Sequence, residues 1–164
     1  MSRQKTFTIL VLGLALAFGV AIALLAVFGE GESELALTEY FQQIDPIVSG
    51  IDDRTGAQVV DEPAQAFTIW ELALSFTARD LDAIDPPREV AAVHQELVDA
   101  IHEEEAAVAN LADQHLEVQS LDEVERIRDG DEDLLLAYGH TGEACAKLRE
   151  IANANGIEVE LELC

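Results

Sequence analysis

The side chains whose spacing best suits metal binding lie on one predicted helix. Asp99, His102 and Glu105 follow one another at intervals of three residues. That interval brings side chains to one face of a helix, and imidazole and carboxylate groups are common metal ligands. A di-iron bundle needs two Glu-x-x-His pairs and two further glutamates, and none of the other three histidines has an acid three positions before it. The sequence therefore offers three candidate metal ligands and predicts no cofactor.

Other patterns that carry chemistry are incomplete. Asp129, Asp131 and Asp133 begin like a calcium-binding loop, but Leu134 replaces the required glycine and His140 replaces the bidentate glutamate. No G-x-S-x-G motif and no phosphate-binding glycine loop occurs in the sequence. We therefore do not expect an enzyme.

Both cysteines lie near the C-terminus. Cys145 precedes Gly156 by 11 residues, about 16 Å along a helix, and the eight residues that follow Gly156 can span roughly 26 Å when extended. If the chain reverses at Gly156, Cys164 can therefore reach Cys145. The spacing predicts a Cys145–Cys164 disulfide, and the alternative is two separate free thiols.

An apolar run near the N-terminus determines where the rest of the chain is expected to lie relative to a membrane. Residues 7–28 contain no charge and span roughly 33 Å as a helix, enough to cross a bilayer of about 30 Å. Arg3 and Lys5 precede the run and acids follow it, so the positive-inside rule puts the N-terminus in the cytoplasm. We expect an uncleaved, single-pass anchor in the cell membrane, and the alternative is a secreted protein whose signal peptide is cleaved. The expected parts are a cytoplasmic N-terminus (1–6), a transmembrane helix (7–28), a linker (29–33) and an extracytoplasmic domain (34–164).

The charge is very unevenly distributed. The chain has 33 acidic and 9 basic residues, a formal charge of −24, and all the acids follow the apolar run. Such a surface repels phosphate backbones, so nucleic acid is excluded as a partner. The acidity fits either solubility in a salty habitat or contact with divalent cations.

Helical periodicity dominates the rest of the sequence. Apolar residues at intervals of three and four predict one bent helix over 34–60, a second that begins near Pro63 and ends before Asp85, and a third over about 87–117. On the third helix we expect a buried side with Val90, Val93, Leu97, Ile101, Val108, Leu111 and Leu116, and a wet side with Asp99, Glu103, Glu104 and Glu117.

Two further helices and a tail complete the prediction. Ser120 and Glu123 form a capping box for a fourth helix. Helical patterning then resumes from Leu134 to Ala154, with Leu135 among its stripe residues, and stops at Gly156. Residues 157–163 alternate apolar and acidic, which predicts an extended tail with one face on the bundle. The expected fold is therefore all-α: the transmembrane helix, an antiparallel bundle of about four helices, and an extended C-terminal tail.

Three short motifs occur together in this sequence. They are Leu-Thr-Glu-Tyr-Phe at 37–41, Pro-Pro-x-Glu-Val at 86–90 followed by His94 and Leu97, and the segment from Cys145 through Gly156 to Cys164. In these motifs the chain resembles uncharacterised exported helical proteins of environmental bacteria such as Chloroflexi and Actinobacteria, which often end in a paired-cysteine tail. The resemblance implies an exported, helical, disulfide-closed domain and carries no activity.

These observations together favour a non-enzymatic binding or structural module of the cell envelope. The partners we expect are the membrane, through residues 7–28, and a protein of the envelope. The alternative is a bundle that binds a metal or a small ligand, for which a pocket lined by His94, Trp70 and Tyr138 would be the sign.

Overall fold

The computed structural model describes residues 36–50, 63–159 and 161. The predicted anchor (7–28), its flanking segments (1–6 and 29–33), the second half of the predicted first helix, and Cys164 lie outside the described residues. Within them, no helix is both long enough and apolar enough to cross a membrane.

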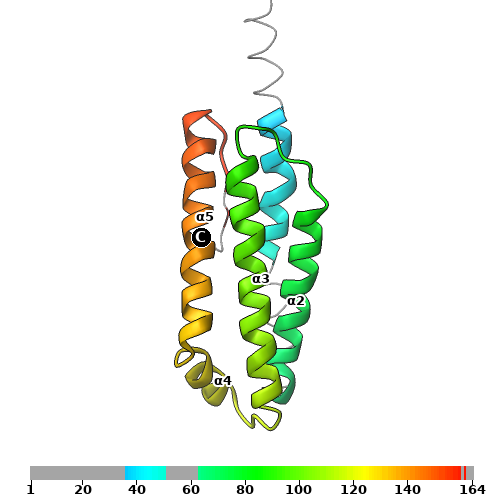
Figure 1. Cartoon of the computed structure of the whole chain (residues 1–164), viewed down its shortest axis with the longest axis vertical. Helices are drawn as coiled ribbons and strands as arrows, with labels where there is room; N and C mark the ends of the chain where they lie inside the picture. The colour runs from blue at the N-terminus through cyan, green and yellow to red at the C-terminus, as the bar shows by residue number, and fades with distance from the viewer. Residues whose placement is uncertain (1–35, 51–62, 160, 162–164) are drawn as a thin grey trace, which may run out of the picture. The chain divides into compact units, whose positions relative to one another are not determined.

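The described part of the chain is all-α and contains no strand. Residues 36–50 are helical, and a short 3₁₀ turn, η1 (Pro63–Gln65), leads into α2 (Ala66–Asp82). The remaining helices are α3 (Ala91–Gln114), α4 (Leu121–Arg128) and α5 (Glu132–Ala154). Figure 1 shows α2, α3 and α5 as long neighbouring rods with the short α4 at one end. The helical bundle predicted from periodicity is therefore confirmed.

One continuous apolar core joins the helices. Its fully buried side chains come from the 36–50 segment, from α2, α3 and α5, and from the tail; they include Phe41, Ile44, Leu74, Leu81, Leu97, Ile101, Leu134, Leu148 and Leu161. Helix α3 packs against both α2 and α5, so it is central among the described helices. Burying a side chain such as Leu148 stabilises the fold by about 1.5–3 kcal/mol.

The predicted helix boundaries follow local capping chemistry. The Ser120 side chain accepts a hydrogen bond from the Glu123 backbone at 3.3 Å, and the Glu123 carboxylate accepts one from the Gln119 backbone at 3.1 Å. This is the reciprocal arrangement of a capping box, reaching one residue further back. Asp131 caps α5 in the same way, through the Leu134 backbone at 2.8 Å. Gly156 has a φ of 70°, a left-handed conformation that glycine adopts at no steric cost after a helix.

Helix α3 is shorter than the sequence predicted. Instead of starting near residue 87, it starts at Ala91, because Pro87 to Val90 form a turn closed by a backbone hydrogen bond of 3.1 Å. It ends at Gln114, so Leu116 lies in the following loop and is 73% exposed. The prediction that Leu116 is buried is therefore wrong, because the helical periodicity does not extend past the helix end.

Two further burial predictions are also wrong. Leu135 is 49% exposed, and its neighbour Leu134 occupies the buried position at the start of α5. Glu104, which we expected on the wet side of the third helix, is only 4% exposed.

The tail lies against the bundle as its alternating pattern predicts. Ile157 and Val159 pack on the core, Glu158 is exposed, and Leu161 is fully buried. The Leu161 backbone N–H donates to the Asp45 carboxylate at 2.8 Å, and its carbonyl accepts from the Arg149 guanidinium at 3.3 Å. The tail thus connects the 36–50 segment with α5.

Candidate functional site

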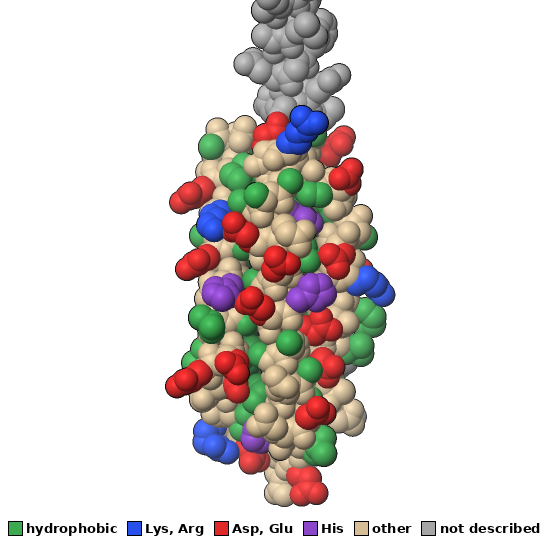
Figure 2. All heavy atoms as spheres, viewed as in Figure 1, with side chains coloured by type: hydrophobic (Ala, Val, Ile, Leu, Met, Phe, Trp, Pro, Cys, Tyr) green, Lys and Arg blue, Asp and Glu red, His purple; other side chains and the backbone are tan. Residues whose placement is uncertain are grey.

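A groove lies between α3 and α5 on the described surface. It has a volume of about 260 Å³. Alanines Ala100 and Ala144 form part of its wall, and its other lining residues are Glu96, Asp99, Glu103, His140, Glu143 and Lys147. Figure 2 shows carboxylates and histidines spread over the face that α3 and α5 present to the viewer.

Helical spacing places these polar groups on facing sides of the two helices. Glu96, Asp99 and Glu103 recur at intervals of three and four on α3, and His140, Glu143 and Lys147 do the same on α5. Such intervals keep side chains on one face of a helix. Because the two helices are antiparallel (Figure 1), the two rows meet in opposite order.

Two ion pairs cross the groove seven residues apart. Lys147 Nζ lies 2.6 Å from the Glu96 carboxylate, and His140 Nδ1 lies 2.6 Å from the Glu103 carboxylate, a pair that is ionic only when the imidazole is protonated. The hydrogen bond with Glu96 and the charge of that carboxylate raise the pKa of Lys147. The groove holds four carboxylates and one lysine, which leaves a formal charge of −3 with His140 neutral. It is therefore built to attract positive charge.

A buried carboxyl group lies in the same helix interface. Thr141, which is also 4% exposed, donates a short hydrogen bond to the Glu104 carboxylate. Burial raises the pKa of Glu104 from its ordinary 4.5 to about 7, and the hydrogen bond from Thr141 opposes that rise. The shift has the expected sign, because a low-dielectric surrounding disfavours the charged form. Near neutral pH, Glu104 is therefore a mixture of protonated and ionised forms.

The structure brings His102 and Glu105 together and directs Asp99, the third predicted metal ligand, to the groove. His102 Nδ1 lies 3.1 Å from the Glu105 carboxylate, and His102 Nε2 lies 3.5 Å from Asp82 on α2. Asp99 instead accepts a hydrogen bond from Gln95 at 2.9 Å and lines the groove. Both ring nitrogens of His102 therefore face carboxylates, one on its own helix and one on α2. Across the described part of the chain, no cluster of three or more suitable side chains could hold a metal ion.

His94 belongs to a second polar site, which lies inside the bundle. Its Nδ1 lies 3.1 Å from the Tyr40 hydroxyl, and both residues are buried. Burial lowers the pKa of His94, although a hydrogen bond with the Leu81 backbone and the charge of Asp82 oppose the change. A neutral ring donates through one nitrogen and accepts through the other, so the Leu81 contact leaves Nδ1 to accept from Tyr40. Burial likewise raises the pKa of Tyr40.

His94, Trp70 and Tyr138, whose shared pocket would have favoured a small-ligand site, make separate ring contacts. The rings of Trp70 and Tyr138 lie 6.0 Å apart between centroids, and both residues pack on the apolar core. His94 contacts Tyr40 instead. These three residues therefore serve two separate packing sites.

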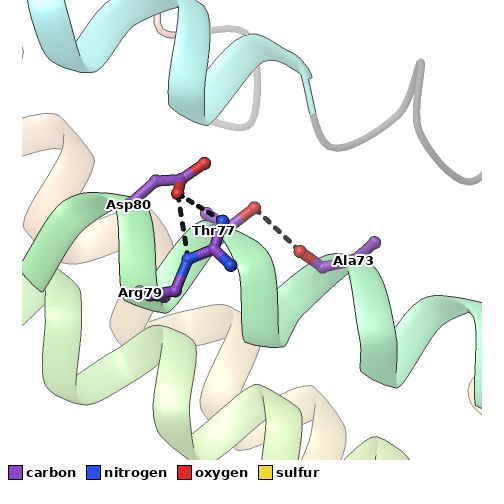
Figure 3. A network of polar contacts seen from close by, with 4 residues as sticks. All are labelled: Ala73, Thr77, Arg79 and Asp80. Atoms are coloured by element: carbon purple, nitrogen blue, oxygen red, sulfur yellow. Dashed lines mark hydrogen bonds and ion pairs between the residues drawn. The ribbon is translucent and has the colours of Figure 1, made fainter.

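Helix α2 carries two polar contacts between its own residues, one buried and one at the surface (Figure 3). Thr77 Oγ1 donates to the Ala73 carbonyl at 3.0 Å, and the Arg79 guanidinium contacts the Asp80 carboxylate at 2.9 Å. The same guanidinium lies 5.0 Å above the ring of Phe76, which is partly exposed. A cation over an aromatic face is a favourable contact, and here it covers an apolar side chain at the surface.

The sequence alone singled out neither the groove nor the Glu104–Thr141 pair. The charged residues that line the groove repeat with the helical period on both α3 and α5, and this repetition could have predicted a charged face on each helix. No family model, curated protein or solved structure matches the chain.

Proposed function

We propose that this protein is a non-enzymatic binding module of the cell envelope, held at the membrane by residues 7–28, which captures a positively charged segment of a protein partner. The observation that carries the proposal is the α3–α5 groove, which is lined by four carboxylates, one lysine and one histidine. The alanines of its wall leave room for the aliphatic part of a lysine or arginine side chain.

The charge of the whole chain supports the same kind of partner. A formal charge of −24 creates a negative potential around the bundle, and such a potential speeds the encounter with cationic partners and repels acidic ones. Exposed ion pairs contribute only about 0.2–1 kcal/mol each, so the groove needs several pairs to bind a segment usefully.

The binding test uses the full chain solubilised in detergent. Binding of a fluorescent lysine-rich peptide is measured by fluorescence anisotropy. Replacing Asp99 and Glu143 together (D99N, E143Q) removes two groove charges, and the control D113N, E117Q removes two exposed charges elsewhere. We expect the groove variant to weaken binding about 2- to 30-fold, from two exposed pairs at the magnitude above, and the control to change it less than the groove variant does. If both variants weaken binding equally, the peptide responds to the net charge of the protein, and the proposed binding site in the groove is wrong.

The anchored location is part of the proposal, supported by the charge-free run and the flanking Arg3 and Lys5. A reporter that is active only outside the cytoplasm, fused to the C-terminus, should be active and should sediment with membranes. A reporter active in the cytoplasm would contradict the orientation. Release of the active fusion into the medium, with a new N-terminus after residue 28, would indicate a cleaved signal peptide.

We also propose that a Cys145–Cys164 disulfide closes the tail. Cys145 is buried, no cysteine of the described residues is a free thiol, and Leu161 docks on the bundle three residues before Cys164. An oxidising compartment would allow the bond to persist. Unfolding the exported protein without reductant and adding a maleimide should label neither cysteine, whereas labelling of both would contradict the bond.

A further inference from the structure

We propose that the contact between α3 and α5 is a pH-responsive seam, which is closed when Glu104 is protonated and loosens when Glu104 ionises. The seam consists of two neighbouring pairs, Glu103 with His140 and Glu104 with Thr141. Consecutive residues on α3 thus meet consecutive residues on α5, one pair at the surface and one inside.

The buried pair responds to a rise in pH. Ionisation of Glu104 places a negative charge on a side chain that is only 4% exposed, and among the described residues its hydrogen-bond partner is the Thr141 hydroxyl. The neighbouring Glu103–His140 contact, at 2.6 Å, holds the two helices together beside it. An alkaline shift therefore adds a buried charge to the contact between α3 and α5.

The other charged groups near the seam lie in the groove above it. On α3 these are Glu96 and Asp99, and on α5 they are Glu143 and Lys147. Lys147 is held by Glu96 at 2.6 Å, so it is not oriented to neutralise Glu104. No charge on α2 or on the 36–50 segment contributes to the behaviour of Glu104 in the described structure, where the causes are burial and the Thr141 hydrogen bond.

The direction of the stability change follows from proton linkage. The pKa of Glu104 is higher in the folded chain, about 7, than its ordinary 4.5, so the unfolded chain releases this proton first as the pH rises. Folding is then favoured fully below pH 4.5 and progressively less up to about pH 7. The difference of 2.5 pH units corresponds to a roughly 300-fold decrease in the folding equilibrium constant.

The test compares the pH dependence of urea unfolding for the full chain and two single variants in detergent. Glu104→Gln keeps the size of the side chain but cannot titrate, whereas Glu143→Gln removes an exposed charge from the same groove. We expect Glu104→Gln to remove most of the loss of stability between pH 4.5 and 7, and Glu143→Gln to retain it. An unchanged pH dependence in Glu104→Gln would overturn the proposal.

A second variant separates the switch from a purely structural role. Thr141→Val removes the hydroxyl that stabilises the ionised Glu104, so the Glu104 carboxyl should titrate at a higher pH than in the parent chain. The carbon-13 shift of that carboxyl reports its titration directly. Hydrogen exchange of the α5 amides, compared between the parent and Glu104→Gln at equal pH, should be faster in the parent above pH 7. A Glu104 titration near pH 4.5, or equal exchange in both chains, would refute the seam.

Discussion

Replacing Tyr40 by phenylalanine is the sharpest perturbation of the buried polar site. The change removes one hydroxyl and leaves His94 Nδ1, which lies 3.1 Å from that hydroxyl, without its partner. Both residues are buried, with His94 only 5% exposed, so water cannot easily replace the lost bond. An unsatisfied buried acceptor destabilises a fold by about 1–3 kcal/mol.

The assay is urea unfolding of the full chain in detergent, followed by circular dichroism at pH 8, where His94 is neutral in both states. We expect Tyr40→Phe to lower the free energy of unfolding by about 1–3 kcal/mol with an unchanged denaturant slope. Thr68→Val is the control, because it removes a hydroxyl of similar chemistry from an exposed position on α2, and it should change stability by less than about 0.5 kcal/mol.

A double-mutant cycle with His94→Leu identifies the interaction itself. If Tyr40 and His94 act through their hydrogen bond, the double variant should lose less stability than the sum of the two single variants. The reasoning is refuted if the two losses add without any coupling, or if Tyr40→Phe is as mild as Thr68→Val.

Two further predictions concern pH and capping. Burial lowers the pKa of His94, so the contribution of neutral His94 to stability is complete above pH 6.5 and is lost as the pH falls from 6.5 towards the pKa in the folded chain. In the Glu104→Gln background, the free energy of unfolding should therefore decrease as the pH falls below 6.5. The additional change His94→Leu should abolish that decrease. Ser120→Ala removes the cap of α4 and should lower the free energy of unfolding by about 1 kcal/mol, which thermal unfolding measures. Ser120→Asp keeps a capping oxygen and should retain most of that stability. If Ser120→Asp is as unstable as Ser120→Ala, the capping role is wrong.

Local chemistry explains why much of the fold could be predicted. Pro63, the Asp85-Pro86-Pro87 break, the Ser120 cap and Gly156 each act on their own backbone neighbours, so the sequence carries their effect without knowledge of the tertiary structure. The apolar alternation of the tail likewise predicts which side chains face the core.

Glu104 shows what that reasoning misses. The intervals Leu97, Ile101, Glu104, Val108 and Leu111 are four, three, four and three, so periodicity places Glu104 in the buried stripe. A carboxylate is usually exposed to solvent, so its charge predicts the opposite face of the helix. Only the register of α5 on α3 reveals the Thr141 hydroxyl that makes burial tolerable.

The groove was hidden for a related reason. Lys147 lies 51 residues from its partner Glu96, and His140 lies 37 residues from its partner Glu103. No local rule joins residues so far apart in the sequence. The candidate metal ligands failed to converge because Asp99 and His102 project toward different neighbouring helices, α5 and α2.

The docking of Leu161 has a consequence for the order of folding. Its backbone bonds to Asp45, 116 positions earlier in the chain. Contacts of such high sequence separation form slowly, because the chain between them must close first. The helices can therefore pack through their nearer contacts before the tail docks, and a chain with a detached tail leaves the Asp45 carboxylate and the hydrophobic site of Leu161 uncovered.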